Sequence, residues 1–172
     1  MSRSSPVIGA LVSLIALSAA TSCRRADQSA EVAEIERVIA SSIGWALTKD
    51  TVALFGAFVH DSTFFIYHPT LEPTVEGWAE FVPLVDTWLN PAFKATHFEL
   101  KQLRITFSRS GTVAWYSALL DDFGEWDGRP IGWEDVRWTG VLEKREGRWL
   151  IMQMHFSFAE EQIRGAKAQG DG

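Results

Sequence analysis

Two histidines occupy positions from which a side chain could transfer a proton. His155 lies in the last of several alternating segments, and His68 precedes Pro69 at the end of a short β-branched and aromatic segment. An imidazole has an unperturbed pKa of about 6.5, so it can act as a general acid or base near neutral pH. We therefore predict His155 and His68 as candidate catalytic residues, with a histidine buried against a neighbouring hydroxyl as the alternative.

The neighbours of His155 on its predicted strand divide into two faces. Alternate side chains of a strand share one face, so Gln153 and Ser157 share that of His155, whereas Met154 and Phe156 lie on the other. The apolar face suits a core or a dimer surface. The polar face suits a pocket wall, and we expect Gln153 and Ser157 to bind a ligand beside His155.

The preceding segment places a carboxylate and a guanidinium at alternate positions. Trp133, Asp135, Arg137 and Thr139 share one face of the predicted strand, with neighbours about 7 Å apart, so Asp135 and Arg137 can pair directly. Such a pair could hold a ligand carboxylate or orient a catalytic histidine, and Arg137 could stabilise an anion. Thr139 and Asp135 are therefore candidate ligand contacts, and a plain salt bridge at a strand end is the equal alternative.

Aromatic residues are abundant in this chain, which contains eight Trp and eleven Phe. That much ring surface can build a large core and can also line a pocket for an apolar ligand. Trp45, Tyr67 and Trp115 are the aromatic residues that we expect at such a pocket. The predicted partner is accordingly a small, largely apolar molecule.

Several other kinds of site lack support in the sequence. The four histidines and the single cysteine do not occur at the spacings typical of zinc ligands, so no metal site is predicted. The chain has no glycine-rich phosphate loop and no G-x-S-x-G nucleophile motif. The net charge of −6, without a cluster of Lys or Arg, argues against nucleic acid as a partner. We expect no cofactor.

The elements that must position these residues follow from hydrophobic periodicity. Apolar residues recur at helical spacing from residue 30, Asp50 is typical of the N-cap of a second short helix, and a third helix is predicted over 75–89 before Asn90-Pro91. A short strand is predicted at 63–67. Four longer segments have the period of strands and are separated by tight-turn pairs: 95–108, 112–126, 130–144 and 148–158. Helices followed by a strand meander predict the α+β class.

The N-terminus is typical of an export signal that ends at a lipid-modified cysteine. Arg3 precedes an uncharged, mostly apolar run over 6–20, and Ala20-Thr21-Ser22-Cys23 resembles the bacterial lipobox. The apolar run is short for a transmembrane helix, which needs about 20 residues. Lipidation also accounts for a cysteine without a partner. The alternative is a secreted protein with a free thiol.

The expected organisation and location follow from this interpretation. We predict a signal peptide over 1–22, a tether over 23–30, one domain over 31–160 and a flexible tail over 161–172. The lipid on Cys23 would anchor the protein in the cell envelope. Because Arg24 rather than Asp follows the cysteine, we expect the outer membrane, with the domain facing the periplasm.

The predicted order of elements places a set of residues at defined positions. These residues end the first two helices, stand in the middle strands, and form a Gly-x-Trp and a His-x-Ser pattern in the last strand. They are Trp45 and Asp50, Phe58 and Asp61, Ala114-Trp115, Arg137 and Thr139, Gly147-Arg148-Trp149 and His155-Phe156-Ser157. With this order of elements, these residues resemble the SnoaL-like group of the nuclear transport factor 2-like superfamily. The resemblance covers about Glu31 to Phe158.

The resemblance implies a cone-shaped fold in which three N-terminal helices and a curled antiparallel sheet surround a pocket. It also implies a homodimer that pairs through the outer face of the sheet. His68-Pro69 looks like the Asp-Pro pair that supplies the base in the ketosteroid isomerases of this superfamily. Trp45 stands where those isomerases have a tyrosine, so the resemblance does not extend to their oxyanion hole.

Two functions remain open on the sequence. The first, which we favour, is a lipid-anchored module that binds a small apolar ligand without turning it over. The second is a cofactor-independent enzyme of the isomerase, cyclase, dehydratase or hydrolase type, with His155 or His68 as acid or base. The second function requires that these side chains converge on one cavity within about 4–6 Å of each other.

Overall fold

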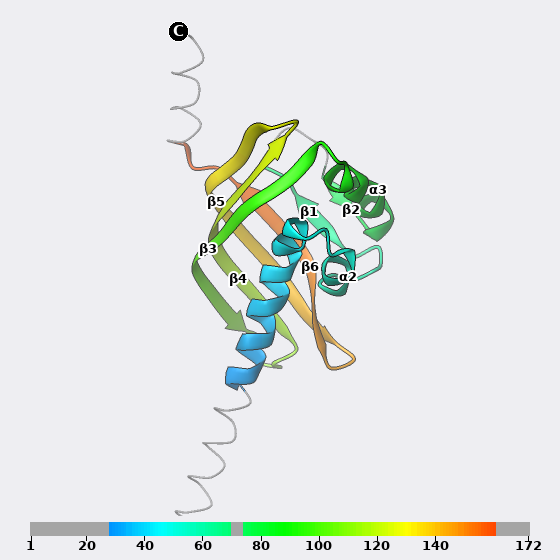
Figure 1. Ribbon diagram of the computed structural model, residues 1–172. Coiled ribbons are helices and arrows are strands. Elements are labelled where there is room, and N and C mark those ends of the chain that lie inside the picture. The colour runs from blue at the N-terminus through cyan, green and yellow to red at the C-terminus, as the bar shows by residue number, and fades with distance from the viewer. Residues whose placement is uncertain (1–27, 70–73, 161–172) are drawn as a thin grey trace, which may run out of the picture. The chain divides into compact units, whose positions relative to one another are not determined.

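The structure, a computed structural model, describes residues 28–69 and 74–160 (Figure 1). The chain divides into two compact units, Met1–Ile35 and Glu36–Gly172, and the second holds the described strands and the helices described after residue 44. The predicted signal peptide, Cys23 and the tail over 161–172 lie outside the described residues. Among the described helices none is long and apolar enough to cross a membrane.

Helices come first in the chain, as predicted. A helix over residues 28–44 leads into the 3-10 helix η1 (Trp45–Leu47), which is followed by α2 (Thr51–Gly56). Asp50 caps α2 by accepting a hydrogen bond of 3.0 Å from the backbone N–H of Ala53, which confirms the predicted N-cap. The third helix, α3 (Trp78–Leu89), begins later than predicted, because Val75 belongs to a strand.

The sheet has six strands in the described residues, in the order β2-β1-β6-β5-β4-β3. They are β1 (Phe65–Tyr67), β2 (Val75–Glu76), β3 (Phe93–Phe107), β4 (Val113–Trp126), β5 (Arg129–Arg145) and β6 (Arg148–Ser157). β1 runs parallel to β6 and all other pairs are antiparallel, so the sheet is mixed rather than purely antiparallel. The α+β prediction is confirmed. β2 is absent from the predicted elements, because a strand of two residues has no detectable period.

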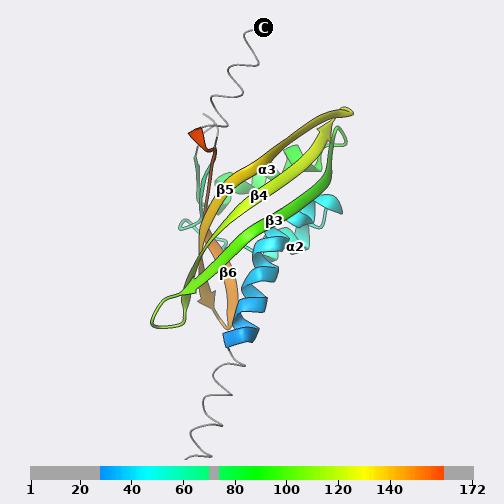
Figure 2. The same cartoon turned by 90° about the vertical axis from the view of Figure 1, so that its left-hand side faces the viewer.

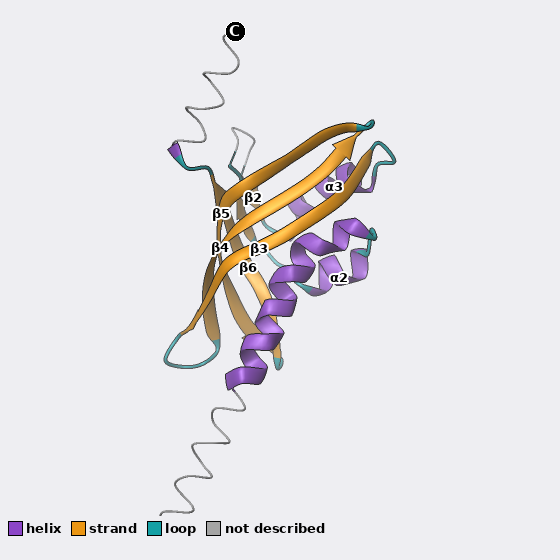
Figure 3. Ribbon diagram, turned by 60° about the vertical axis from the view of Figure 1, so that its left-hand side comes forward, coloured by secondary structure: helices purple, strands orange, loops and turns teal. Residues whose placement is uncertain are grey.

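Both α2 and α3 lie on one side of the sheet (Figure 3). In the view of Figure 2 the long strands β3, β4 and β5 lie in front of α3, so their other side carries no helix among the described residues. Burial follows this arrangement: Tyr116 and Leu120 of β4 are buried, whereas Trp115, which precedes Tyr116 and points to the helix-free side, is 46 % exposed. We call the side covered by the helices the inner face and the opposite side the outer face.

Four register shifts interrupt the alternation of inner and outer residues in the described sheet. Two lie between β3 and β4, and the other two bear on the cavity. On β6 the register shifts opposite Val141 and Leu142, so that Ile151 and Met154, three residues apart, are both buried. On β5 two residues stand opposite one residue of β4 at Asp121. Such bulges reverse the faces of all residues beyond them. Face assignments made by counting in twos therefore hold only between the irregularities.

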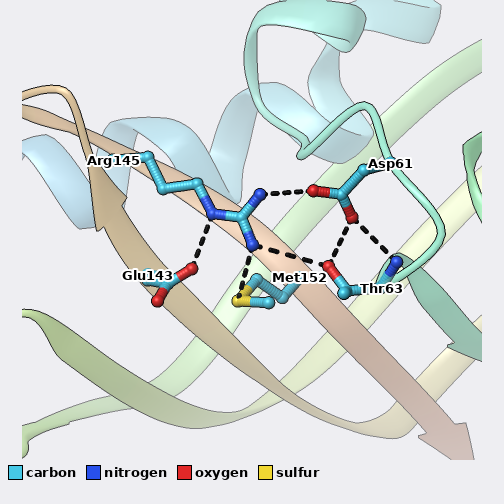
Figure 4. A network of polar contacts seen from close by, with 5 residues as sticks. All are labelled: Asp61, Thr63, Glu143, Arg145 and Met152. Carbon is cyan, nitrogen blue, oxygen red and sulfur yellow. Dashed lines mark hydrogen bonds and ion pairs between the residues drawn. The ribbon is translucent and has the colours of Figure 1, made fainter.

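A polar network joins the loop before β1 to the end of β5 (Figure 4). Arg145 donates to Asp61 at 2.5 Å and to Glu143 at 2.6 Å, and it also reaches Thr63. Asp61 accepts in addition from the backbone N–H of Thr63 at 2.8 Å and from its hydroxyl at 2.5 Å. The hydroxyl of Thr63, and then Arg145, lower the pKa of Asp61 to about 2.

We expect Asp61→Asn to lower the free energy of unfolding at pH 7 by about 0.5–1 kcal/mol, a modest amount because the ion pair is partly exposed. The folded pKa lies below that of the unfolded chain, so this contribution is complete above about pH 4 and is lost as the pH falls towards about 2. Urea unfolding of the wild type and the variant at pH 7, 4 and 2.5 measures the difference.

Asp86→Asn is the matched control, since the Asp86 side chain is exposed and makes no hydrogen bond or ion pair with the described residues. A difference between wild type and Asp61→Asn that stayed constant down to pH 2.5 would contradict the assigned role of the carboxylate.

Candidate functional site

A cavity of about 360 Å³ lies between the inner face of the sheet and the helices. Its walls are mostly apolar, and η1, α2 and α3 contribute aromatic and aliphatic side chains that include Trp45, Leu54, Phe81 and Trp88. The sheet contributes Met154 and Phe156 of β6 among others. A cavity of this size and character suits a small, largely apolar molecule.

Four polar residues of the described part of the chain line this apolar cavity: Ser42, His68, Thr87 and Asp122. The hydroxyl of Ser42 is engaged, because it donates to the backbone oxygen of Ile39 at 2.8 Å. Lysine and arginine do not occur among the described lining residues. The two groups that can exchange a proton near neutral pH are His68 and Asp122.

Asp122 reaches the cavity because of its place in β4. It follows Leu120 by two residues, and regular alternation places both on the inner face. The Asp122 carboxylate is half-buried, and no described residue forms a hydrogen bond or ion pair with it. Desolvation disfavours its charged form and raises its pKa to about 6. A carboxyl group with this pKa can accept or donate a proton at neutral pH.

His68 follows β1, where the alternation also holds. Ile66 is buried, Tyr67 is 53 % exposed on the outer face, and His68 again lines the cavity. The imidazole lies edge-to-face against the Trp133 ring, with centroids 5.2 Å apart, and 6.4 Å from the ring of Phe156. Two aromatic rings therefore bound the position of this histidine.

Trp133 lines the same cavity, whereas Asp135, Arg137 and Thr139, which were predicted to share its face, do not. Val136 is opposite Leu120 and Trp133 is opposite Asp122, so two residues of β5 bulge out opposite Asp121 alone. This shift separates Trp133 from Arg137 and Thr139, which stay on the outer face and are exposed. The simple alternation that placed them together was wrong because it passed through a bulge.

The expected convergence of His155 and His68 is also wrong. His155 is opposite Thr139 and packs edge-to-face against Tyr67, with ring centroids 5.5 Å apart. It does not line the cavity, and its strand neighbours Met154 and Phe156 line it instead. The apolar face of the last strand is the cavity wall and the polar face is the outer one, so a mechanism that uses both histidines is excluded by the geometry.

The remaining candidates divide in the same way. Trp45 lines the cavity, whereas the other ligand-binding and anion-stabilising candidates do not. Those others are Tyr67, Trp115, Asp135, Arg137, Thr139, Gln153 and Ser157. The predicted pair of Asp135 with Arg137 is not formed, because the Asp135 carboxylate instead lies 2.5 Å from Nζ of Lys101.

Asp122 and Trp133 are two cavity residues that sequence reasoning did not propose for the site. A usable signal existed for Asp122: it continues the inner series Ala114, Tyr116, Ala118 and Leu120 at intervals of two. No comparable signal existed for Trp133, because the bulge depends on pairing with β4. Among the described residues no group of three His, Cys, Asp or Glu side chains could hold a metal ion.

Comparison with known proteins agrees with this architecture. The sequence profile of the SnoaL-like domain matches residues 35–161. No curated protein matches the chain. Among solved structures, an NTF2-like protein from Streptomyces avermitilis, provisionally named a dehydratase, has a TM-score of 0.64 at 15 % identity over 77 % of this chain and 98 % of its own.

Two further structures illustrate the range of proteins with this fold. One from Novosphingobium aromaticivorans, provisionally named a scytalone dehydratase, has a TM-score of 0.63 at 14 % identity over 75 % of this chain and 84 % of its own. The association domain of CaMKII from C. elegans has a TM-score of 0.57 at 15 % identity over 77 % and 98 %. At these identities the likeness concerns the fold alone.

The Asp122 carboxyl predicts an unusual dependence of stability on pH. Its folded pKa of about 6 lies above the value of about 3.9 expected for the unfolded chain, so the native state loses stability as the pH rises from about 4 to about 6. We expect Asp122→Asn to unfold at higher urea concentration than the wild type at pH 8, with a gain of up to about 2 kcal/mol that disappears near pH 4. Carbon-13 NMR titration of the carboxyl group provides the direct measurement. A measured pKa near 4, or a gain independent of pH, would contradict this account.

Proposed function

The chain belongs to the SnoaL-like domain family of the NTF2-like superfamily, and from that premise we propose that its cavity binds a small, largely apolar molecule on which Asp122 and His68 transfer protons. The observation that carries this proposal is the Asp122 carboxyl. It lies in an apolar cavity without a described partner, and burial raises its pKa to about 6. A carboxyl group whose pKa is raised by burial in a cavity is a candidate for acid–base chemistry.

The reaction class follows from the groups available. Asp122 as carboxylate takes a proton from an acidic C–H of the bound molecule, and the resulting carboxylic acid or His68 returns a proton to another atom of that molecule. Return to carbon gives an isomerisation, whereas protonation of a departing hydroxyl gives a dehydration with release of water. Neither reaction consumes a cofactor. The dehydratase names of two structural neighbours are consistent with this class.

Binding without turnover is the second candidate, and the composition of the cavity favours it. Most of the lining is aromatic or aliphatic, and among the lining residues that the structure describes one carboxyl group and one imidazole are titratable. Both candidate functions predict affinity for a neutral apolar molecule, so a binding measurement does not distinguish them. A measurement of proton transfer to or from the bound molecule does.

Two further parts of the proposal concern assembly and location. A second copy of the chain covers the outer face of the sheet, where Trp115 is 46 % exposed and Tyr67 is 53 % exposed. Exposed aromatic surface of this kind is typical of protein interfaces. A lipid on Cys23 anchors the protein in the outer membrane facing the periplasm, as the lipobox-like segment indicates.

Deuterium exchange tests the proton-transfer function. We expect the wild type, incubated in D₂O with a panel of small cyclic ketones, to accelerate deuterium incorporation next to the carbonyl group of at least one of them. Asp122→Asn should reduce this rate by about 10²–10⁴-fold, the usual contribution of a general base. The wild-type rate should rise between pH 5 and 7, because deprotonation of Asp122 through a pKa of about 6 creates the base.

His155→Gln is the matched control, since His155 lies outside the cavity and its replacement should leave the exchange rate unchanged. If the wild type binds the neutral fluorophore N-phenyl-1-naphthylamine in the cavity but exchanges none of the ketones, binding without turnover is the better description. Exchange that survives Asp122→Asn would rule out the role given to Asp122.

Fractionation of cells tests the location. We expect the wild-type protein in the outer-membrane fraction with incorporated radiolabelled palmitate, and Cys23→Ser in the soluble fraction without label, because the chain contains a single cysteine. The domain itself should keep its thermal unfolding midpoint. A Cys23→Ser protein that remained with the membrane would show that another feature retains it.

A further inference from the structure

Three charged residues form a cluster behind the cavity, one on each of the strands β3, β4 and β5. Nζ of Lys101 lies 2.7 Å from the carboxylate of Asp121 and 2.5 Å from that of Asp135. Asp121 is 8 % exposed, which is unusual for a carboxylate and depends on these contacts. We call Lys101, Asp121 and Asp135 the three-strand cluster.

The three-strand cluster surrounds the bulge of β5. Glu134 and Asp135 together stand opposite Asp121, and Asp135 has a φ of 52°, in the left-handed region that a residue with a side chain rarely adopts. The backbone N–H of Asp135 donates to the Asp121 carboxylate at 2.8 Å. Lys101 therefore holds both the side chain and, through Asp121, the backbone of the strained residue.

The bulge decides which side chain of β5 enters the cavity. Counting in twos from Val136 without it would place Glu134 on the inner face, whereas the extra residue places Trp133 there. Trp133 lies 5.2 Å from the His68 ring and 5.8 Å from that of Phe156, measured between centroids. A tryptophan that supports the cavity histidine thus replaces a carboxylate.

The backbone next to Trp133 allows β5 to lie unusually close to β4. Gly132 has a φ of 154°, and a Cβ at this position would lie 2.5 Å from the carbonyl oxygen of Asp122. Glycine here lets β5 approach β4 beside the two cavity residues Asp122 and Trp133. The close approach and the bulge together fix where Trp133 stands relative to Asp122.

We propose that the three-strand cluster is a positioning device for the ligand site: Lys101, Asp121 and Asp135 hold the bulge that turns Trp133 into the cavity and against His68. The inference rests on the proposed function only in taking the cavity as the ligand site. None of the three residues lines the cavity, so they act through Trp133 and not on the ligand. Bulges that re-aim a side chain beside a functional site are a known use of this irregularity.

Replacement of the lysine tests the device. The protein is labelled with 5-fluorotryptophan, the fluorine resonance of Trp133 is assigned with Trp133→Phe, and binding of N-phenyl-1-naphthylamine is followed by fluorescence. We expect Lys101→Met to shift or broaden the Trp133 resonance and to weaken probe binding about tenfold. The resonance of Trp138, which is buried on the same strand beyond the bulge, should stay in place.

Two lysine variants serve as controls. Lys101→Arg keeps the positive charge and should restore both the Trp133 resonance and the affinity. Lys94→Met removes an exposed lysine of the same strand that forms no hydrogen bond or ion pair with the described residues, and it should behave as wild type.

A second pair of variants keeps the test valid if Lys101→Met fails to fold. Asp135→Gly removes the carboxylate but accepts a positive φ, so it should displace the Trp133 resonance less than Asp135→Val does. A valine at position 135 disfavours a positive φ, so Asp135→Val should displace the Trp133 resonance. An unchanged Trp133 resonance and probe affinity in both Lys101→Met and Asp135→Val would overturn the proposal and leave the cluster as a stabiliser of the sheet.

Absence of probe binding by the wild type would count against the proposed function, whereas the fluorine spectra would still decide the positioning role.

Discussion

The pairing of β4 with β5 is the constraint on which the cavity depends. These strands supply Asp122 and Trp133 from directly opposite positions, and every inward side chain on β5 takes its place from the register with β4. A shift of one residue would exchange the faces of the strand. The pairing is regular from Val113 to Leu120, changes at the bulge and continues to Trp126, so one irregular site separates the packed part of the sheet from the part that lines the cavity.

The carboxylates on the two faces of β4 at this irregular site have opposite surroundings. On the outer side Asp121 and Asp135 share Lys101, and the backbone N–H of Asp135 with Lys101 lowers the pKa of Asp121. One residue further on, Asp122 faces aromatic walls without such contacts, and burial raises its pKa to about 6. Adjacent carboxylates are thus separated in their protonation by the two faces of one strand. The compensated carboxylate supports structure, and the uncompensated one is available for chemistry.

The apolar cavity and the exposed outer face also share a cause. Because the sheet covers the cavity with its inner face, the polar and aromatic residues between the inner ones must lie outside. His155, Arg137 and Thr139 look like a site in the sequence because they alternate with core residues, and they lie on the outer face for the same reason. Alternation identifies two faces but does not tell which of them encloses a ligand.

The sequence by itself determined the α+β class, the N-cap at Asp50, the four long strands within a few residues of their ends, and the family, because period, turn pairs and caps are local properties. It also contained His68 and Trp45 as cavity candidates. Tertiary structure alone decided which sheet face became the cavity wall, that β1 lies parallel to β6, and that Trp133 and Asp122 meet at one site. Each of these depends on the register between strands far apart in the chain. At Asp135 the register depends in turn on a lysine from a third strand, which no pattern within β5 could predict.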